Sequence, residues 1–156
     1  MIDLDSARDA VAAFEELLDR TDAEAAHVRV SPDAWTLAEI TGHLIDSAAN
    51  NHQRFARLRL GDLEGFPGYE AQQWVEAQNY DRCDFLILAT LWSSYNAFLL
   101  HLAENTPEQA LGNAWIRPDG PQTLEFLISD YYAHLRLHSD HYAGRLSEVE
   151  AASENR

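Results

Sequence analysis

Apolar residues recur every three or four positions along most of the chain, in four blocks separated by polar or glycine- and proline-containing segments. This spacing places the apolar side chains on one face of an α-helix. The blocks therefore predict helices over about 5–20, 36–60, 81–106 and 123–149. Four such helices predict an all-α fold, a four-helix bundle. The alternation that strands need is weak throughout, so we expect no sheet.

Several residues mark where the predicted helices begin. Thr36 and Glu39 form a T-x-x-E capping box, in which each side chain accepts a hydrogen bond from an exposed backbone N–H. Asp81 is a plausible N-cap for the third helix. The turn-forming sequence Pro118–Pro121 precedes Thr123, where the fourth helix begins.

The connection between the second and third helices, about 61–80, is long and carries three glycines and the aromatic residues Phe66, Tyr69 and Trp74 before it ends at Tyr80. Connections of this length in a small domain are usually functional or cross from one end of the fold to the other. A helix of about 25 residues is roughly 37 Å long, and twenty residues can span that distance at about 3.3 Å each. Helices two and three can therefore run parallel, in an up-down-down-up topology, with a short helix near 71–77 in the crossover.

The chain has 156 residues, of which 46% are hydrophobic, as expected for one globular domain. We expect this domain to span 1–150, followed by a flexible polar tail over 151–156. Acidic residues outnumber basic ones by 26 to 11, for a net charge of −15. That charge argues against nucleic-acid or anionic membrane partners. No apolar run approaches the roughly 20 residues that cross a membrane, and no signal peptide is visible, so we expect a cytoplasmic protein.

The composition also excludes several kinds of chemistry. All 11 basic residues are arginine, which rules out mechanisms that need a Schiff-base or P-loop lysine. The single cysteine, Cys83, rules out an intrachain disulfide, a CxxC redox motif and a cysteine-rich zinc site. The seven histidines carry more information.

His134 and His138 are four residues apart in the fourth predicted helix, which places both imidazoles on one face. This arrangement suits two adjacent positions around one metal ion. The pair alone is a weak signal, since it arises by chance and the sequence HLRLH lacks the glutamate of the HExxH motif. A third ligand has to come from another helix, and His43, beside the apolar stripe of helix two, is the best candidate. Taken by itself, His43 is better explained as a histidine at the edge of the core.

The segment 35–47, WTLAEITGHLIDS, resembles the second helix of the DinB-like superfamily of helical-bundle metal proteins. It is most similar to the branch of YfiT-like metal-dependent hydrolases. The likeness continues through Asn50 and Arg54 and resumes in 131–141, which resembles the last helix of that branch. The aromatic crossover and the turn before the last helix also fit, so the resemblance spans about 5–147.

This resemblance implies an up-down-down-up bundle with one divalent metal ion per chain, held by one histidine of the second helix and two of the last. By position, these ligands are His43, His134 and His138. Three neutral imidazoles leave coordination positions open, as catalytic zinc sites do. Nitrogen ligands fit zinc or nickel best and do not exclude iron or manganese. His141 matches a further recurrent histidine, with a supporting or merely surface role.

Four more residues are candidates for catalysis or substrate binding. Asp46 follows His43 by three positions and could be the general base, or a solvated helix carboxylate. Tyr131, one turn before the histidine pair, could donate a hydrogen bond into the site or belong to the core. Asn50 and Arg54 could bind a substrate carboxylate or phosphate. They could equally fix the crossover by hydrogen bonds or an ion pair.

Three functions are compatible with these residues. The first is hydrolysis of a small molecule by a water on the three-histidine metal site. The second is S-transfer with a low-molecular-weight thiol such as bacillithiol, mycothiol or glutathione, with Arg54 and Arg57 as the nearby cationic groups. The third is a non-enzymatic binding module in which the metal only staples two helices. We also expect a homodimer, because bundles of this type often pair through helix faces.

Overall fold

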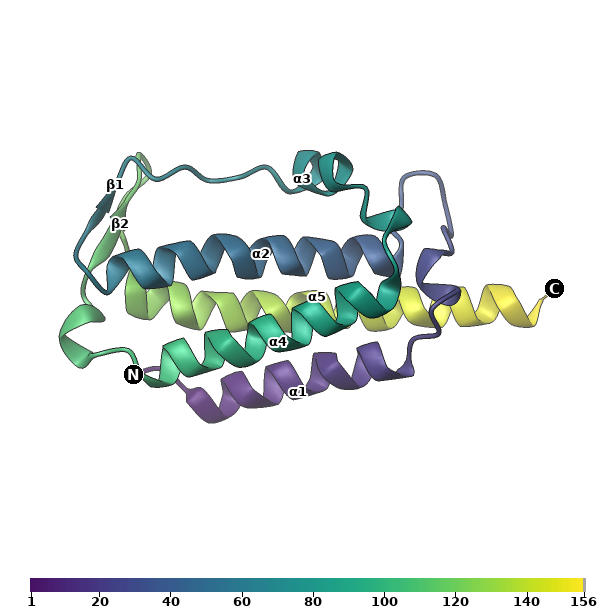
Figure 1. Ribbon diagram of the computed structural model, residues 1–156, viewed down its shortest axis with the longest axis horizontal. Coiled ribbons are helices and arrows are strands. Elements are labelled where there is room, and N and C mark those ends of the chain that lie inside the picture. The colour runs from purple at the N-terminus through teal and green to yellow at the C-terminus, as the bar shows by residue number, and fades with distance from the viewer. Residues whose placement is uncertain (156) are drawn as a thin grey trace.

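The computed structural model describes residues 1–155, in which four long helices lie side by side along one axis (Figure 1). These are α1 (Leu4–Arg20), α2 (Leu37–Leu58), α4 (Phe85–Glu104) and α5 (Leu124–Glu154). In Figure 1, α1 runs from left to right, α2 and α4 both return to the left, and α5 runs to the right again. The predicted all-α four-helix bundle with up-down-down-up topology is confirmed.

An aromatic cluster from three helices forms the middle of the core. The Phe14 ring of α1 lies 4.6 Å from that of Trp92 in α4 and 5.1 Å from that of Tyr142 in α5. All three side chains are fully buried. Because aromatic side chains bury large apolar areas, this cluster joins α1, α4 and α5 at one level of the bundle. The core residues follow the spacing by which the helices were predicted.

The capping box at the start of α2 is confirmed, and the cap predicted for the third bundle helix is wrong. The Thr36 hydroxyl accepts a hydrogen bond from the Glu39 N–H, and the Glu39 carboxylate accepts one from the Thr36 N–H. The N-cap of helix α4 is Asp84, three residues after the expected cap. Asp81 lies in a 3₁₀ turn, where its carboxylate pairs with Arg29 at 3.5 Å.

The crossover from α2 to α4 returns along the outside of the bundle from its left end to its right end (Figure 1). It contains one short helix, α3 (Ala71–Gln78), which matches the expected helix near 71–77. A 3₁₀ turn, η2 (Tyr80–Arg82), then leads toward α4. Both α3 and η2 pack against α2, so the crossover covers the outer side of that helix.

A small three-stranded sheet closes the left end of the bundle, contrary to the expectation of no sheet. Its strands are β1 (Leu63–Glu64), β2 (Ala114–Ile116) and β3 (Gln122–Thr123). β1 pairs parallel with β2, and β2 pairs antiparallel with β3 across the turn at 118–121. Strands of two or three residues are too short to show alternation in the sequence. The sheet joins the start of the crossover to Thr123, which is the N-cap of α5.

Helix α4 corrects the expectation that no segment is apolar enough to cross a membrane. Among residues 1–155 it alone meets that criterion by length and composition, with a hydropathy of 1.4. Its only Asp, Glu, Lys or Arg residue is Glu104, at its end. Core helices of bundles meet the same criterion, and α4 packs against α1 and α2.

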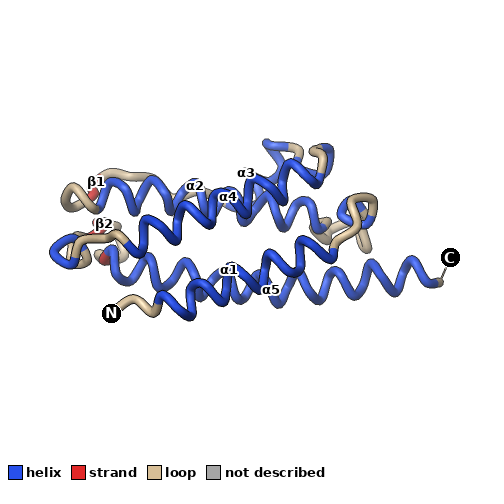
Figure 2. Tube along the Cα trace, turned by 60° about the horizontal axis from the view of Figure 1, so that its bottom comes forward, coloured by secondary structure: helices blue, strands red, loops and turns tan. Residues whose placement is uncertain are grey.

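Helix α5 extends beyond the other bundle helices at the C-terminal end (Figure 2). Residues 151–154, expected in the flexible tail, form its exposed last turn. Residue 156 of that tail lies outside the described residues. The domain boundary at 150 stays a prediction.

Candidate metal centre

Three histidines from two antiparallel helices meet between α2 and α5. The Nε2 atom of His138 lies 3.2 Å from that of His43 and 3.0 Å from that of His134. One nitrogen from each ring lies within 4.8 Å of the other two. The α5 pair shares a face because the residues are four apart, and α2 brings His43 opposite them. The structure thus brings all three predicted ligands together.

The distances between these nitrogens fit a metal ion. With metal–nitrogen bonds of about 2.0–2.1 Å, ligand nitrogens are about 2.9 Å apart at right angles and about 3.3 Å apart at tetrahedral angles. The observed separations of 3.0 and 3.2 Å lie in this range. A neutral imidazole nitrogen offers one hydrogen or one lone pair, so the Nε2 atom of His138 cannot complete a normal hydrogen bond with both neighbours. A cation among three lone pairs removes this conflict.

Burial keeps these rings in the neutral form that binds metals. Burial is the main cause that lowers the pKa of His43 to about 4, and the neighbouring His134 and His141 lower it further. Burial also lowers the pKa of His138 to about 3, with further contributions from His134, His43 and His141. The pKa of His134 is lowered by burial too, although Asp130 opposes the shift. At neutral pH the three ligand rings therefore offer lone pairs.

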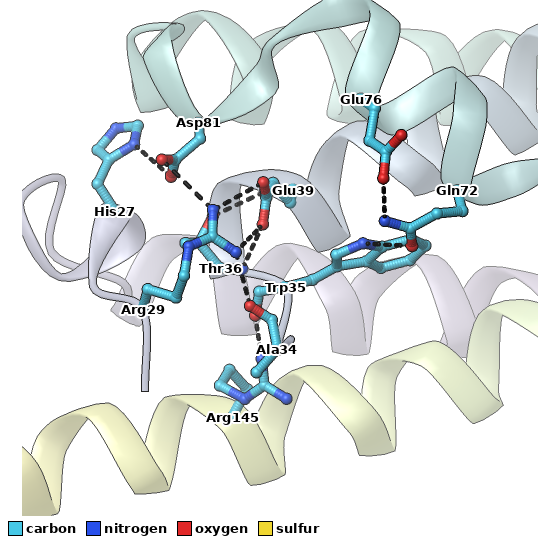
Figure 3. Close-up of polar contacts among 10 residues, drawn as sticks. All are labelled: His27, Arg29, Ala34, Trp35, Thr36, Glu39, Gln72, Glu76, Asp81 and Arg145. Atoms are coloured by element: carbon cyan, nitrogen blue, oxygen red, sulfur yellow. Dashed lines mark hydrogen bonds and ion pairs between the residues drawn. The ribbon is translucent and has the colours of Figure 1, made fainter. Parts of the chain in front are cut away.

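Trp35 covers one side of His43 and is held by two hydrogen bonds. Its ring centroid lies 5.2 Å from that of His43. Its indole N–H donates to the side-chain oxygen of Gln72 in α3 at 3.1 Å. The guanidinium of Arg145 in α5 donates to its backbone carbonyl. The contacts with Gln72 and Arg145, drawn in Figure 3, fix the indole beside His43.

Glu39, one turn before His43, is fully occupied by structural contacts. Beyond the capping box, its two carboxylate oxygens accept hydrogen bonds from Arg29 at 2.9 and 3.0 Å. Arg29 also pairs with Asp81, whose carboxylate lies 3.7 Å from His27 (Figure 3). This network holds the segment before α2 against η2 and leaves no free oxygen on Glu39 for catalysis.

Asp46 is buried one turn after His43 and has one free carboxylate oxygen. Its Oδ1 atom accepts hydrogen bonds from the Tyr80 hydroxyl at 2.6 Å and the Gln78 amide at 2.8 Å. Its Oδ2 atom is buried without a hydrogen-bond partner in the described chain. Burial raises the pKa of this carboxyl, and the two hydrogen bonds oppose the shift. Gly42 permits the close approach, because a Cβ atom there would lie 2.1 Å from the Tyr80 ring.

Tyr131 and Asn50, two other predicted site residues, contact the protein itself. The buried Tyr131 hydroxyl donates to Asn96 Oδ1 at 2.6 Å. Burial raises its pKa well above the usual value. The Asn50 amide donates to the backbone carbonyl of Asp46 at 2.9 Å, within α2. Both side chains thus satisfy polar groups inside the bundle, and their catalytic or binding roles stay predictions.

A cavity of about 280 Å³ lies next to the histidines. It is bounded by α2, the crossover, the β2–β3 hairpin and the first turns of α5. Residues that line it include Asn51, Arg54, Tyr69, Trp115, Tyr131 and His134. It brings together three of the predicted site residues, one of them a metal ligand; Asp46 and Asn50 are not among those that line it. A small molecule in this cavity would therefore lie beside the candidate metal centre.

The sequence model of the DinB superfamily matches residues 6–141. The chain belongs to the DinB superfamily. The resemblance seen in the second and last helices is thereby confirmed. A comparison with curated proteins finds no match.

Two solved structures share this DinB fold. YfiT from Bacillus subtilis, described as a probable metal-dependent hydrolase with an unusual four-helix bundle topology, aligns with a TM-score of 0.76 and 18% identity. That alignment covers 97% of this chain and 85% of YfiT. A mycothiol-dependent maleylpyruvate isomerase aligns with a TM-score of 0.73 and 14% identity, over 88% of this chain and 57% of the isomerase. At these identities the likeness shows the fold, and this chain spans just over half of the isomerase.

Part of the cavity wall of this DinB protein comes from residues that the sequence did not single out as site residues. Tyr69 comes from the crossover, while Trp115 and Arg117 come from the β2–β3 hairpin. In the sequence, the hairpin residues could be noticed only as an aromatic and a basic residue just before the turn at 118–121. Pairing of this segment with the crossover is a tertiary contact, so local patterns do not reveal it.

Proposed function

We propose that the protein is a metal-dependent enzyme that hydrolyses a small molecule beside His43, His134 and His138. The observation that carries this proposal is the convergence of three Nε2 atoms, 3.0 and 3.2 Å apart, at the edge of a cavity. When bound, the metal would supply a Lewis acid and lower the pKa of water. Zinc or nickel suits the three nitrogen donors best, and iron or manganese is compatible with them.

The protein's own residues would divide the remaining work. Asp46 is proposed as the proton acceptor, since its Oδ2 atom has no hydrogen-bond partner and burial raises the pKa of the carboxyl above its usual value. Arg54 is proposed to bind the substrate, because it lines the cavity. Tyr131 would shape the cavity wall, and Asn50 would support this part of α2 through its bond to the helix backbone.

A thiol-dependent S-transferase is the second candidate, favoured by the fold shared with a mycothiol-dependent isomerase. The cavity would then have to hold part of a thiol such as bacillithiol, mycothiol or glutathione. Arg54 faces this space, whereas Arg57 lies over the Phe66 ring at 5.4 Å and is not among the lining residues. In the third candidate, a metal-stabilised binding module, the histidines would only bind a metal that joins α2 to α5 and stabilises the fold.

Turnover assays with and without thiol separate these functions. We expect the zinc- or nickel-reconstituted protein to hydrolyse members of a panel of small esters, amides and lactones without any thiol. The Asp46→Asn variant should be slower by about 10²–10⁴-fold, the usual contribution of a general base, with unchanged metal content. Asp140→Asn, which alters an exposed carboxylate on α5, is the matched control.

The other outcomes of this assay favour the alternatives. A strict requirement for added thiol would replace the hydrolase by the S-transferase. Metal binding that raises stability, with no turnover under either condition, would favour the binding module. Equal rates in Asp46→Asn and the wild type would remove Asp46 from the mechanism.

We further propose that two copies form a cytoplasmic homodimer through α4. Ile87, Leu91 and Phe98 are 59%, 47% and 43% exposed and share one helix face by their spacing. The helix has no charged residue before Glu104, while the chain carries a net charge of −15. Electrostatic repulsion between two copies is therefore weakest along this face of α4. In a two-fold dimer, the exposed apolar side chains of one copy would pack against the same side chains of the other.

The mass in solution tests this dimer. We expect sedimentation equilibrium to give twice the chain mass for the wild type and a monomer for the Leu91→Glu/Phe98→Glu double variant. Leu137→Glu, at an isolated position on α5 that is 69% exposed, should stay dimeric. A monomeric wild type, or a double variant that stays dimeric, would contradict the proposal.

A further inference from the structure

Arg54 is a buried arginine for which the protein provides no anionic partner. Its residue is only 8% exposed, and it lies in a chain where acidic residues outnumber arginines. Within residues 1–155 its guanidinium forms no ion pair and no hydrogen bond, and its Nε atom is buried without a partner. Asp130 lines the same cavity but does not pair with it. Buried charges are normally paired, so this guanidinium is available to a ligand.

The wall next to Arg54 holds a second guanidinium. The Cζ atoms of Arg54 and Arg117 lie 4.3 and 4.9 Å from the centroid of the Trp115 ring. An aromatic face favours cations without neutralising them. Arg117 is already paired with Asp119 at 3.2 Å and donates to Gln122. Arg54 thus carries the uncompensated charge, and Arg117 adds to the positive potential around it.

We infer that this cavity binds a small organic anion and that Arg54 is the residue that recognises its carboxylate or phosphate group. The inference rests on the proposed function for the role of the neighbouring metal. A guanidinium offers two parallel N–H donors that match either anion. The volume of about 280 Å³ suits a small metabolite or the anionic end of a larger one. Since His134 lines the same cavity, an anionic group held by Arg54 would place the rest of the molecule beside the metal centre.

If Arg54 serves to bind an anion, replacing it should not destabilise the ligand-free protein, whereas replacing a structural arginine should. A buried charge without a partner destabilises the folded protein until a ligand neutralises it. Arg54→Met keeps most of the apolar stem and removes the charge. We therefore expect this variant to melt at least as high as the wild type and up to about 2–4 °C higher. An arginine that served only to hold the crossover would lower the melting temperature when replaced.

Titration calorimetry with three probes tests the inference on the full chain, metal-free and zinc-reconstituted. The probes are succinate, inorganic phosphate and the neutral isostere succinamide. We expect at least one anion to bind the metal-free wild type and raise its melting temperature, while succinamide does not bind. The tighter of the two anions identifies the group as a carboxylate or a phosphate. A shift of the Trp115 indole N–H resonance would place the bound anion at this wall.

Matched variants locate the anion. Arg54→Met should weaken binding by about 10–100-fold, the loss expected for a hydrogen bond to a charged group, with unchanged metal content. Arg54→Lys should bind with intermediate affinity and provides the same test if the methionine variant does not fold. Arg57→Met removes the same charge from the same helix outside the cavity and should bind as the wild type does.

Two outcomes would overturn the inference. One is that neither anion binds, with or without zinc. The other is anion binding that survives both Arg54 substitutions. If that binding also requires zinc, the anion binds to the metal. The proposed hydrolase function would then be unaffected, and only the role of Arg54 would be refuted. Absence of metal binding in the wild type would instead remove the proposed function and leave the anion titrations of the metal-free protein interpretable.

Discussion

Replacing His134 and His138 together with alanine is expected to abolish metal binding while the bundle stays folded. The wild type should carry on the order of one divalent ion per chain, as a single cluster of three histidines implies. The double variant keeps only His43. Loss of a residue that merely supports a metal ligand costs about 10–100-fold in affinity, so loss of two ligands should reduce bound metal to background.

Plasma mass spectrometry on untagged protein measures this directly and names the ion among zinc, nickel, iron and manganese. A matched control is the His52→Ala/His101→Ala variant, which removes two histidines outside the cluster. It should keep the wild-type metal content, and circular dichroism should show folded helix in all three proteins. No metal in the wild type after reconstitution with all four ions would refute both enzymatic functions as stated here.

The bundle and its candidate ligands could be predicted because their signals are local. Apolar spacing defined the four long helices, and the i,i+4 spacing placed His134 and His138 on one face. Local spacing was weaker evidence for His43 as a ligand, because one histidine beside an apolar stripe is usually a residue at the edge of the core. Its place beside the apolar stripe made it the best candidate for a third ligand, and the ordered resemblance to the DinB pattern strengthened that assignment before the structure placed it 3.2 Å from His138.

The cavity could not be predicted, because segments far apart in the sequence build it. Strands of two or three residues bring Trp115 to Arg54 and the start of the crossover to the start of α5. Similarly, the sequence predicted Asp81 as the helix cap, whereas the structure has Asp84 as the N-cap and pairs Asp81 with Arg29. These features depend on contacts between residues far apart in the sequence, so local propensity does not reveal them.

The same fold occurs in a probable metal-dependent hydrolase and in a mycothiol-dependent isomerase, so the bundle alone does not define a reaction. In the proposed function, the metal centre would set the class of chemistry and the cavity next to it would select the substrate. In this protein the cavity wall contains one uncompensated guanidinium, Arg54, and one metal ligand, His134. The reaction is therefore best sought among small anionic compounds.

The metal-free protein is expected to lose stability as the pH falls below about 6.5, and most steeply between about pH 6 and 4. In the folded state the pKa of His43 is lowered to about 4 and that of His138 to about 3, mainly by burial. In the unfolded chain both rings would titrate near 6.5. The unfolded state therefore binds more protons in this window, and protons favour unfolding. Since one pKa unit corresponds to about 1.4 kcal/mol, His43 alone should contribute on the order of 3 kcal/mol by pH 4.

Urea unfolding in a metal chelator, from pH 8 down to pH 4.5, measures this loss. The His43→Gln/His138→Gln variant should show a flatter pH dependence than the wild type, while His52→Gln should keep the wild-type slope. The comparison between variants separates the contribution of the histidines to the pH dependence of stability from that of the carboxyl groups. Asp46 acts in the opposite sense, because a folded-state pKa raised by burial makes protonation favour the folded state. If the double variant and the wild type lose stability in parallel, burial does not lower the pKa values of His43 and His138 in the folded protein.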